Sequence, residues 1–203
     1  MKQINKYINE RLHINKDIES NYYNYHPKTR DELKELVDKL IKERGKEANL
    51  NDIDTSEITD MSALFYYSSF NGDISQWDVS NVKDMSNMFE DSKFNGDISN
   101  WDVSNVTDME GMFIYSNFTG ENGDISNWDV SNVKYMNSMF MRSRFNGDIS
   151  KWDVSNVEHM GSMFYNSPFN GDISKWNVSN VKNMSYIFDD SPLEKNPPKW
   201  YKE

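Results

Sequence analysis

Two columns of acidic residues recur through this sequence, and carboxylates are the side chains that most often bind Ca²⁺ in proteins. The first column is Asp73, Asp97, Asp124, Asp148 and Asp172, and the second is Asp78, Asp102, Asp129, Asp153 and Asn177. Calcium coils concentrate several ligands in every turn, whereas this pattern offers few. We therefore expect each first-column Asp to accept a backbone N–H in its own turn and the second column to face water, with no metal or cofactor bound.

The other residues that could do chemistry are scattered along the chain. His13, His26 and His159 lie in different regions, and none pairs with a second ligand at metal-binding spacing. The sequence has no cysteine, which excludes a thiol nucleophile, a thiolate metal site and a disulfide. It also has no zinc-protease, phosphate-loop, dinucleotide or serine-elbow motif. The sequence therefore predicts a protein that is not an enzyme.

A better candidate for function is a pair of variable positions inside an otherwise regular repeat. These positions follow a recurring phenylalanine and hold aromatic, apolar or arginine side chains in several units. Exposed aromatic residues around an arginine have the composition of a binding hot spot. A three-residue insertion around Glu121 lies at the next corner of the chain. The predicted partner-binding residues are Tyr66, Tyr67, Ile114, Tyr115, Glu121, Met141, Arg142 and Tyr165. The alternative is that these side chains only pack against neighbouring corners.

The repeat itself predicts the architecture. The tryptophans Trp77, Trp101, Trp128, Trp152, Trp176 and Trp200 are 24 or 27 residues apart, within the unit F-N-G-D-I-S-x-W-D-V-S-N-V-x-x-M-x-x-M-F. A period of about 20 to 29 residues is typical of leucine-rich solenoids. Ile74, Trp77 and Val79 have the apolar spacing of the strand in a leucine-rich repeat. The apolar residues from Val82 to Phe89 have the spacing of a buried helical stripe. We therefore predict an α/β repeat solenoid with a leucine-rich-repeat-like parallel β-sheet on one side and short helices on the other.

Three details complete this prediction. The asparagine before each helical stripe, such as Asn81, is expected to cap the helix. Each Asn-Gly pair, such as that at 71 and 72, is expected to supply positive φ at a tight corner. The exposed polar columns of the sheet face offer a second candidate contact surface. Its residues are Gln76, Asp78, Asn100, Asp102, Asn127, Asp129, Lys151 and Asp153.

The chain divides into a helical N-terminal segment and cap, residues 1–48, and the solenoid, residues 49–203. Thr29 and Glu32 form a capping box ahead of an apolar stripe, and Gly45 ends it, which predicts an amphipathic helix over the end of the core. A weaker helix is expected around Ile4, Ile8 and Leu12, within a segment that could mediate oligomerisation.

Charge is unevenly spread. Residues 1–48 carry eleven basic and nine acidic side chains, a net charge of +2, and residues 49–203 carry eleven and twenty-four, a net charge of −13. Such a surface repels nucleic acid and anionic lipid, so the expected partner is another protein with a basic surface. The alternative is that the charge only keeps the protein in solution. No apolar run has the length of a secretory signal or a membrane span. We therefore expect a cytoplasmic protein, and a cell-surface one only if a signal has been removed.

The unit NGDISxWDVSNVxxMxxMF resembles the BspA-like leucine-rich-repeat surface proteins, in the short tryptophan-containing variety common in mycoplasmas and gut bacteria. The resemblance covers about residues 49–200 and implies surface adhesion or recognition. A short, unsecreted version with a helical front end also resembles products of phages or mobile elements.

Three functions remain open at this point. The first is a non-enzymatic protein-binding module, for which a phage or mobile element is one expected source. The second is an acidic mimic of nucleic acid that inhibits a host defence protein or a nucleic-acid-binding protein. The third is a structural, assembly or surface-adhesion protein.

Overall fold

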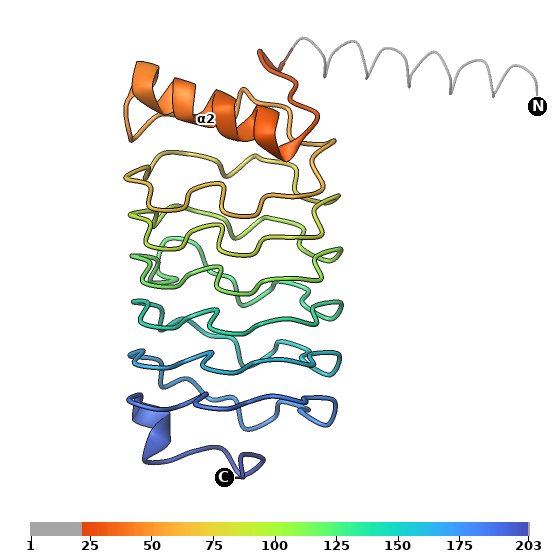
Figure 1. Cartoon of the computed structure of the whole chain (residues 1–203), viewed down its shortest axis with the longest axis vertical. Helices are drawn as coiled ribbons and strands as arrows, with labels where there is room; N and C mark the ends of the chain where they lie inside the picture. Colours follow the sequence, from red (N-terminus) through yellow and green to blue (C-terminus); the bar gives the residue numbers. More distant parts are fainter. Residues whose placement is uncertain (1–21, 203) are drawn as a thin grey trace, which may run out of the picture.

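The structure, a computed structural model, describes residues 22–202. The repeat units form the rungs of a coil and lie over one another along its long axis. A single long helix lies across the N-terminal end of the coil (Figure 1). Helix α2 spans Arg30–Arg44, and the short 3-10 helix η1 spans Pro192–Glu194. The weaker helix predicted around Ile4, Ile8 and Leu12, and most of the segment predicted to mediate oligomerisation, lie outside the described residues.

The predicted α/β solenoid with a parallel β-sheet and repeated helices is wrong. Within residues 22–202, α2 is the one α-helix, and β pairing is limited to isolated parallel bridges such as Asp84 to Asp108. Each rung is a series of tight turns closed by hydrogen bonds between residues three apart. The N–H of Trp77 donates to the carbonyl of Ile74 at 3.1 Å, which folds back the segment predicted to be a strand.

Left-handed residues interrupt the stripe that was predicted to be helical. Asn87 has φ 55°, and the equivalent residues of all the remaining rungs also have positive φ. A left-handed non-glycine residue costs about 1–2 kcal/mol and cannot continue an α-helix. Alternate N–H groups donate instead to the next rung, as from Met85 to the carbonyl of Asp108 at 2.9 Å and from Asn87 to that of Glu110 at 2.8 Å. These bonds between rungs replace the bonds that a helix would make within itself.

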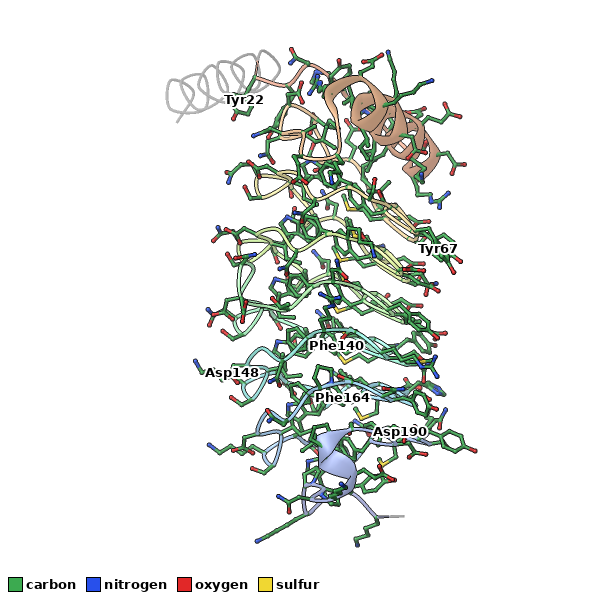
Figure 2. The ribbon with its side chains drawn as sticks, turned by 90° about the vertical axis from the view of Figure 1, so that its left-hand side faces the viewer. Tyr22, Tyr67, Phe140, Asp148, Phe164 and Asp190 are labelled. Carbon is green, nitrogen blue, oxygen red and sulfur yellow. The ribbon has the colours of Figure 1, made fainter. Side chains whose placement is uncertain are left out.

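Stacked phenylalanine rings form the centre of the core. One column is fully buried, with successive ring centroids 5.4–6.2 Å apart and ring planes within 11° of parallel. Its members are Phe65, Phe89, Phe113, Phe140, Phe164 and Phe188. In every rung of this column except the last, a second phenylalanine packs beside the first, as Phe145 does against Phe140 at 4.2 Å. Figure 2 shows Phe140 and Phe164 one above the other in the interior.

Each tryptophan ties its rung to the one before. The indole Nε1–H of Trp152 donates to the carbonyl of Ile125 at 3.0 Å, and the other tryptophans make the equivalent bond at 2.8–3.2 Å. The asparagines predicted to cap helices have the same kind of role, because Asn81 Nδ2 donates to the carbonyl of Ser56 at 2.8 Å. The capping prediction is therefore wrong, and these side chains form a ladder between rungs.

The glycines of the Asn-Gly pairs are not at positive φ, so that prediction is also wrong. Space is the reason for glycine at these positions. A Cβ on Gly72 would lie 2.0 Å from the carbonyl oxygen of Ala48, and one on Gly171 would lie 2.7 Å from the ring of Phe169. The corner therefore needs a residue without a side chain because the backbone runs against the core and its neighbouring rung.

Helix α2 confirms the predicted capping helix. The Thr29 hydroxyl accepts the Glu32 N–H at 3.2 Å, and the N–H of Gly45 donates to the carbonyl of Ile41 at the other end. Three side chains of the helix are fully buried and belong to the same apolar cluster as the rungs. They are Leu33, Val37 and Leu40. The helix therefore covers the N-terminal end of the core.

An ion pair fixes the end of α2 to the first rung and makes the junction sensitive to acid. Arg44 Nη1 and Nη2 lie 2.9 and 3.0 Å from the two carboxylate oxygens of Asp52, and this guanidinium holds the Asp52 pKa below its usual value. Because the folded-state pKa is depressed, the pair stabilises the fold above the unfolded pKa of about 3.9 and loses this effect as pH falls through the folded pKa.

Arg44→Ala is expected to lower the free energy of unfolding by about 1 kcal/mol at neutral pH, a small value because both side chains are partly exposed. The loss should be smaller near pH 3, below the unfolded pKa of about 3.9, because the stabilising effect of the pair decreases as pH falls from that value through the folded pKa. Urea unfolding at the two pH values measures both quantities, with Lys42→Ala on the same helix as the control. An equal loss at both pH values would contradict the ion-pair account.

Candidate functional site

Four of the predicted partner-binding residues meet on one flank of the coil. They line an open pocket of about 370 Å³ together with a serine and a further tyrosine. We refer to the six residues as the tyrosine–arginine patch: Tyr115, Met141, Arg142, Ser162, Tyr165 and Tyr186. Tyr67 and Asp190 occupy the same position of the repeat as Arg142 in other rungs, and both lie on one edge of the molecule (Figure 2).

Arg142 organises the patch. Its guanidinium carbon lies 5.5 Å from the ring centroid of Tyr115 and 5.6 Å from that of Tyr165, so the group lies between two aromatic faces. Its Nη1 donates to the Tyr115 hydroxyl at 2.9 Å. The hydroxyls of Tyr165 and Tyr115 raise the Arg142 pKa. The result is a permanent cation held in one orientation at the surface.

The backbone that presents these side chains is a feature of every rung. Tyr115 and Arg142 have φ 54° and 52°, and their N–H groups donate to carbonyls of the following rung at 3.0 and 2.9 Å. The equivalent residues Tyr67, Asp91 and Asn166 have the same left-handed conformation. The strain therefore belongs to the fold, and only the types of side chain distinguish the patch.

The remaining predicted partner-binding residues lie elsewhere. Tyr66 and Tyr67 contact each other edge to face at 4.5 Å, and the variable positions of the rung between them and the patch hold Glu90 and Asp91. Ile114 is half-buried, as the alternative of packing between corners predicts. Glu121 is exposed in the insertion at the Asn-Gly corner and does not line the pocket.

The sequence prediction missed Tyr186, whose side chain is 65% exposed and completes the pocket. This residue precedes the last phenylalanine of the column by two positions, where other rungs have Asn87, Gly111, Ser138 and Ser162. That position also varies between units and also has positive φ. Comparing every variable position, and not only the two after the phenylalanine, would have found it.

Charge divides the coil into two unequal halves. Residues 49–123 have two basic and fourteen acidic side chains, a net charge of −12, and residues 124–203 have nine and ten, a net charge of −1. Burial and the nearby Asp91 raise the Glu90 pKa, and burial, with Asp84 and Glu110 nearby, raises that of Asp108. Five of the six patch residues lie on the nearly neutral part of the coil, and Tyr115 lies near the end of the acidic half.

The predicted sheet face does not exist, because the segments that were to form it are turns. Its eight predicted residues are nevertheless exposed. The first-column prediction is confirmed, since Asp73 Oδ1 accepts the Ser75 N–H at 3.0 Å and the equivalent residues do the same. The second column makes the same turn, as from Ser80 to Asp78 Oδ1 at 2.9 Å, and so does more than face water. Among residues 22–202, no group of three acidic or histidine side chains is placed to hold a metal ion.

In the part of the chain that the structure describes, residues 22–202, no helix is both long and apolar enough to cross a membrane.

Comparison with curated proteins finds no match, and neither does comparison with solved structures. A family model described as a Mycoplasma protein of unknown function, DUF285, matches residues 32–121 and again residues 114–200. The two matches cover α2 from its first turn and the whole of the coil, and the chain therefore belongs to this DUF285 family of Mycoplasma proteins.

Proposed function

We propose that the chain is a non-enzymatic recognition module that binds another protein through the tyrosine–arginine patch. The observation that carries the proposal is the Arg142 guanidinium held between the faces of Tyr115 and Tyr165 on an exposed flank. Tyrosine and arginine contribute heavily to protein interfaces because they combine large contact area with directed hydrogen bonds. Side chains that are already ordered lose less conformational entropy when a partner docks.

The patch also favours a particular chemistry in its partner. A carboxylate of the partner would pair with the Arg142 guanidinium, and apolar side chains would cover Met141 and Tyr186. The surface that meets the patch is therefore acidic at its centre and apolar around it. The basic partner surface expected from the net charge would face residues 49–123 instead.

The resemblance of the repeat unit to BspA-like surface proteins supports recognition as the general role. Membership of a family of repeat-containing Mycoplasma proteins is compatible with this finer assignment. The same patch would serve a protein displayed at a cell surface or a module encoded by a phage, because binding depends on the flank and not on the compartment.

Substituting Tyr115→Ala and Arg142→Ala together is expected to abolish capture of the native partner from a host lysate. Once mass spectrometry has identified that partner, titration calorimetry should give a dissociation constant raised by at least about 100-fold, or roughly 3 kcal/mol. The matched control is Glu90→Ala with Asp91→Ala, at the two variable positions of the rung before Tyr115. Retention of the partner by the patch variant, or its loss by the control alone, would contradict the proposal.

A second candidate function is suggested by the net charge of −12 over residues 49–123. An acidic mimic of nucleic acid would bind a basic protein through this half of the coil. Its affinity would fall steeply as salt increases, because the interaction depends on screened charges. It would also survive the Tyr115 and Arg142 substitutions, so the same pair of variants separates the two functions.

A further inference from the structure

Backbone N–H groups at the C-terminal edge of the coil have no acceptor within the described part of the chain, residues 22–202. In each earlier rung, alternate N–H groups around the methionine pair donate to carbonyls of the following rung. In the preceding rung the donors are Met160, Ser162 and Phe164, and the acceptors, at 2.8–3.0 Å, are Asn183, Ser185 and Ile187. The equivalent donors of the last rung are Met184, Tyr186 and Phe188, which no acceptor among residues 22–202 reaches.

A fourth donor of the same edge shows what these groups can bind. The N–H of Asp190 is equivalent to that of Asn166, which donates to the next rung at 2.9 Å. It donates instead to a carboxylate oxygen of Glu194 at 3.1 Å. The N–H groups of this edge can therefore donate to an oxygen that is not part of a rung, as the Asp190 N–H does to Glu194.

Apolar side chains are uncovered along the same edge. Val154, Val157 and Met160 are at most 1% exposed, whereas their equivalents in the last rung are only partly buried. Those equivalents are Val178, Val181 and Met184. After Ser191 the chain leaves the path of the rungs, and its tail runs beneath the coil (Figure 1).

The tail covers only part of this edge. The ring of Trp200 lies 6.5 Å from that of Trp176 and 5.8 Å from that of Phe188, and Tyr201 also packs on Phe188. These contacts continue the tryptophan and phenylalanine columns. The segment from Val178 to Tyr186 lies outside them and keeps both its donors and its aliphatic side chains open.

We propose that this open edge, residues 178–186, docks a rung-type segment of another polypeptide. Such a segment presents carbonyls on one side at alternate residues, and these carbonyls would accept hydrogen bonds from the backbone N–H groups of Met184 and Tyr186. It also has aliphatic side chains at the spacing V-x-x-V-x-x-M, to cover Val178 and Val181. The same interface joins successive rungs throughout the coil, so the edge continues a contact that this chain already makes with itself.

A second copy of the chain is a poor occupant for two reasons. Two C-terminal edges placed together would set donors against donors between residues 184 and 188. A head-to-tail arrangement would need the free carbonyls of the first rung, but α2 packs on that end, and Arg30 Nε donates to the carbonyl of Ser62 at 3.0 Å. The edge therefore fits a partner that offers acceptors without a helical cap.

A labelled peptide with the sequence of residues 153–167, DVSNVEHMGSMFYNS, is a direct probe, because this segment makes the required contact within the chain. We expect saturable binding to the whole protein by fluorescence polarisation. In amide hydrogen exchange, the peptide should slow exchange at Met184 and Tyr186 by about tenfold or more, since exchange requires the hydrogen bond to open. Absence of binding, or binding without protection at these two amides, would overturn the proposal.

Val181→Asp places a charge on the apolar edge and should weaken peptide binding by at least about tenfold. Lys151→Asp adds the same side chain on the exposed surface of an earlier rung and should leave binding unchanged. The Tyr115→Ala, Arg142→Ala variant should bind the peptide as the wild type does, which separates this site from the patch. A wild-type dimer that Val181→Asp dissociates in gel filtration would identify a second copy as the occupant and overturn the proposal.

Discussion

Phe140→Ala is expected to lower the free energy of unfolding by about 3–5 kcal/mol. The ring is fully buried, with Phe113 and Phe164 on its two sides at 5.7 and 5.9 Å and Phe145 beside it at 4.2 Å. Its removal leaves a cavity between rungs that the stiff backbone ladder prevents from collapsing. Each rung contacts only its neighbours, so a gap in the middle of the column weakens both halves of the coil.

Urea denaturation followed by tryptophan fluorescence measures this loss. Phe140→Leu keeps most of the buried area and should cost clearly less, which makes it the matched control. Phe188→Ala, at the end of the column, should also cost less than Phe140→Ala because it has no stacked ring of the column below it. A loss below about 1 kcal/mol for Phe140→Ala would show that the stack does not hold the rungs together.

Trp152→Phe is expected to cost about 2–4 kcal/mol, from two sources that act together. The substitution removes the Nε1–H that donates to the carbonyl of Ile125 at 3.0 Å, so this buried acceptor keeps only its bond from the Trp128 N–H at 3.1 Å. It also removes part of a side chain that is 4% exposed and packs near Phe140. The hydrogen bond crosses between rungs, so its loss also loosens the stacking.

The control for this prediction is Trp200→Phe. Trp200 donates to the carbonyl of Ile173 at 2.8 Å, but it lies in the tail and is only partly buried, so water can replace its hydrogen bond. Thermal unfolding of the two variants should therefore differ, with the larger fall in melting temperature for Trp152→Phe. Equal falls would indicate that the indole hydrogen bond adds little beyond ring volume.

The buried positions of the coil could be predicted from the sequence, but the path of the backbone through them could not. Val82, Met85, Met88 and Phe89 are all fully buried, as the apolar spacing indicates. Spacings of three and four residues, however, suit an α-helix and a series of tight turns equally well. The choice depends on hydrogen bonds to the next rung, which the sequence of one unit does not reveal.

The same limit explains the errors about asparagine and glycine. Asn81 precedes an apolar stripe, as a helix cap would, but its amide bonds to the Ser56 carbonyl of another rung. Gly72 follows asparagine, as in a turn with positive φ, but glycine is needed there because the Ala48 carbonyl is close. The asparagine and the glycine were each explained by the conformation of their own segment. In this fold they are needed instead for contacts between residues about 24 positions apart.

The patch was predictable because it departs from the repeat. Positions that vary while their neighbours recur are not needed for the core, and comparison of the units alone predicts Tyr115, Met141, Arg142 and Tyr165. The open C-terminal edge was not predictable in this way. Its unpaired donors are backbone N–H groups between Met184 and Phe188, and a comparison of side chains between units does not reveal them.

The insertion at residues 119–121 has a consequence for how such proteins can diverge. It lengthens one unit to 27 residues, yet Trp128 still donates to the carbonyl of Ile98 at 3.1 Å and Phe113 still stacks on Phe140. Extra residues at this corner are therefore absorbed outside the core. Related chains can gain new loops there, and hence new specificities, while the spine of rings beneath them stays unchanged.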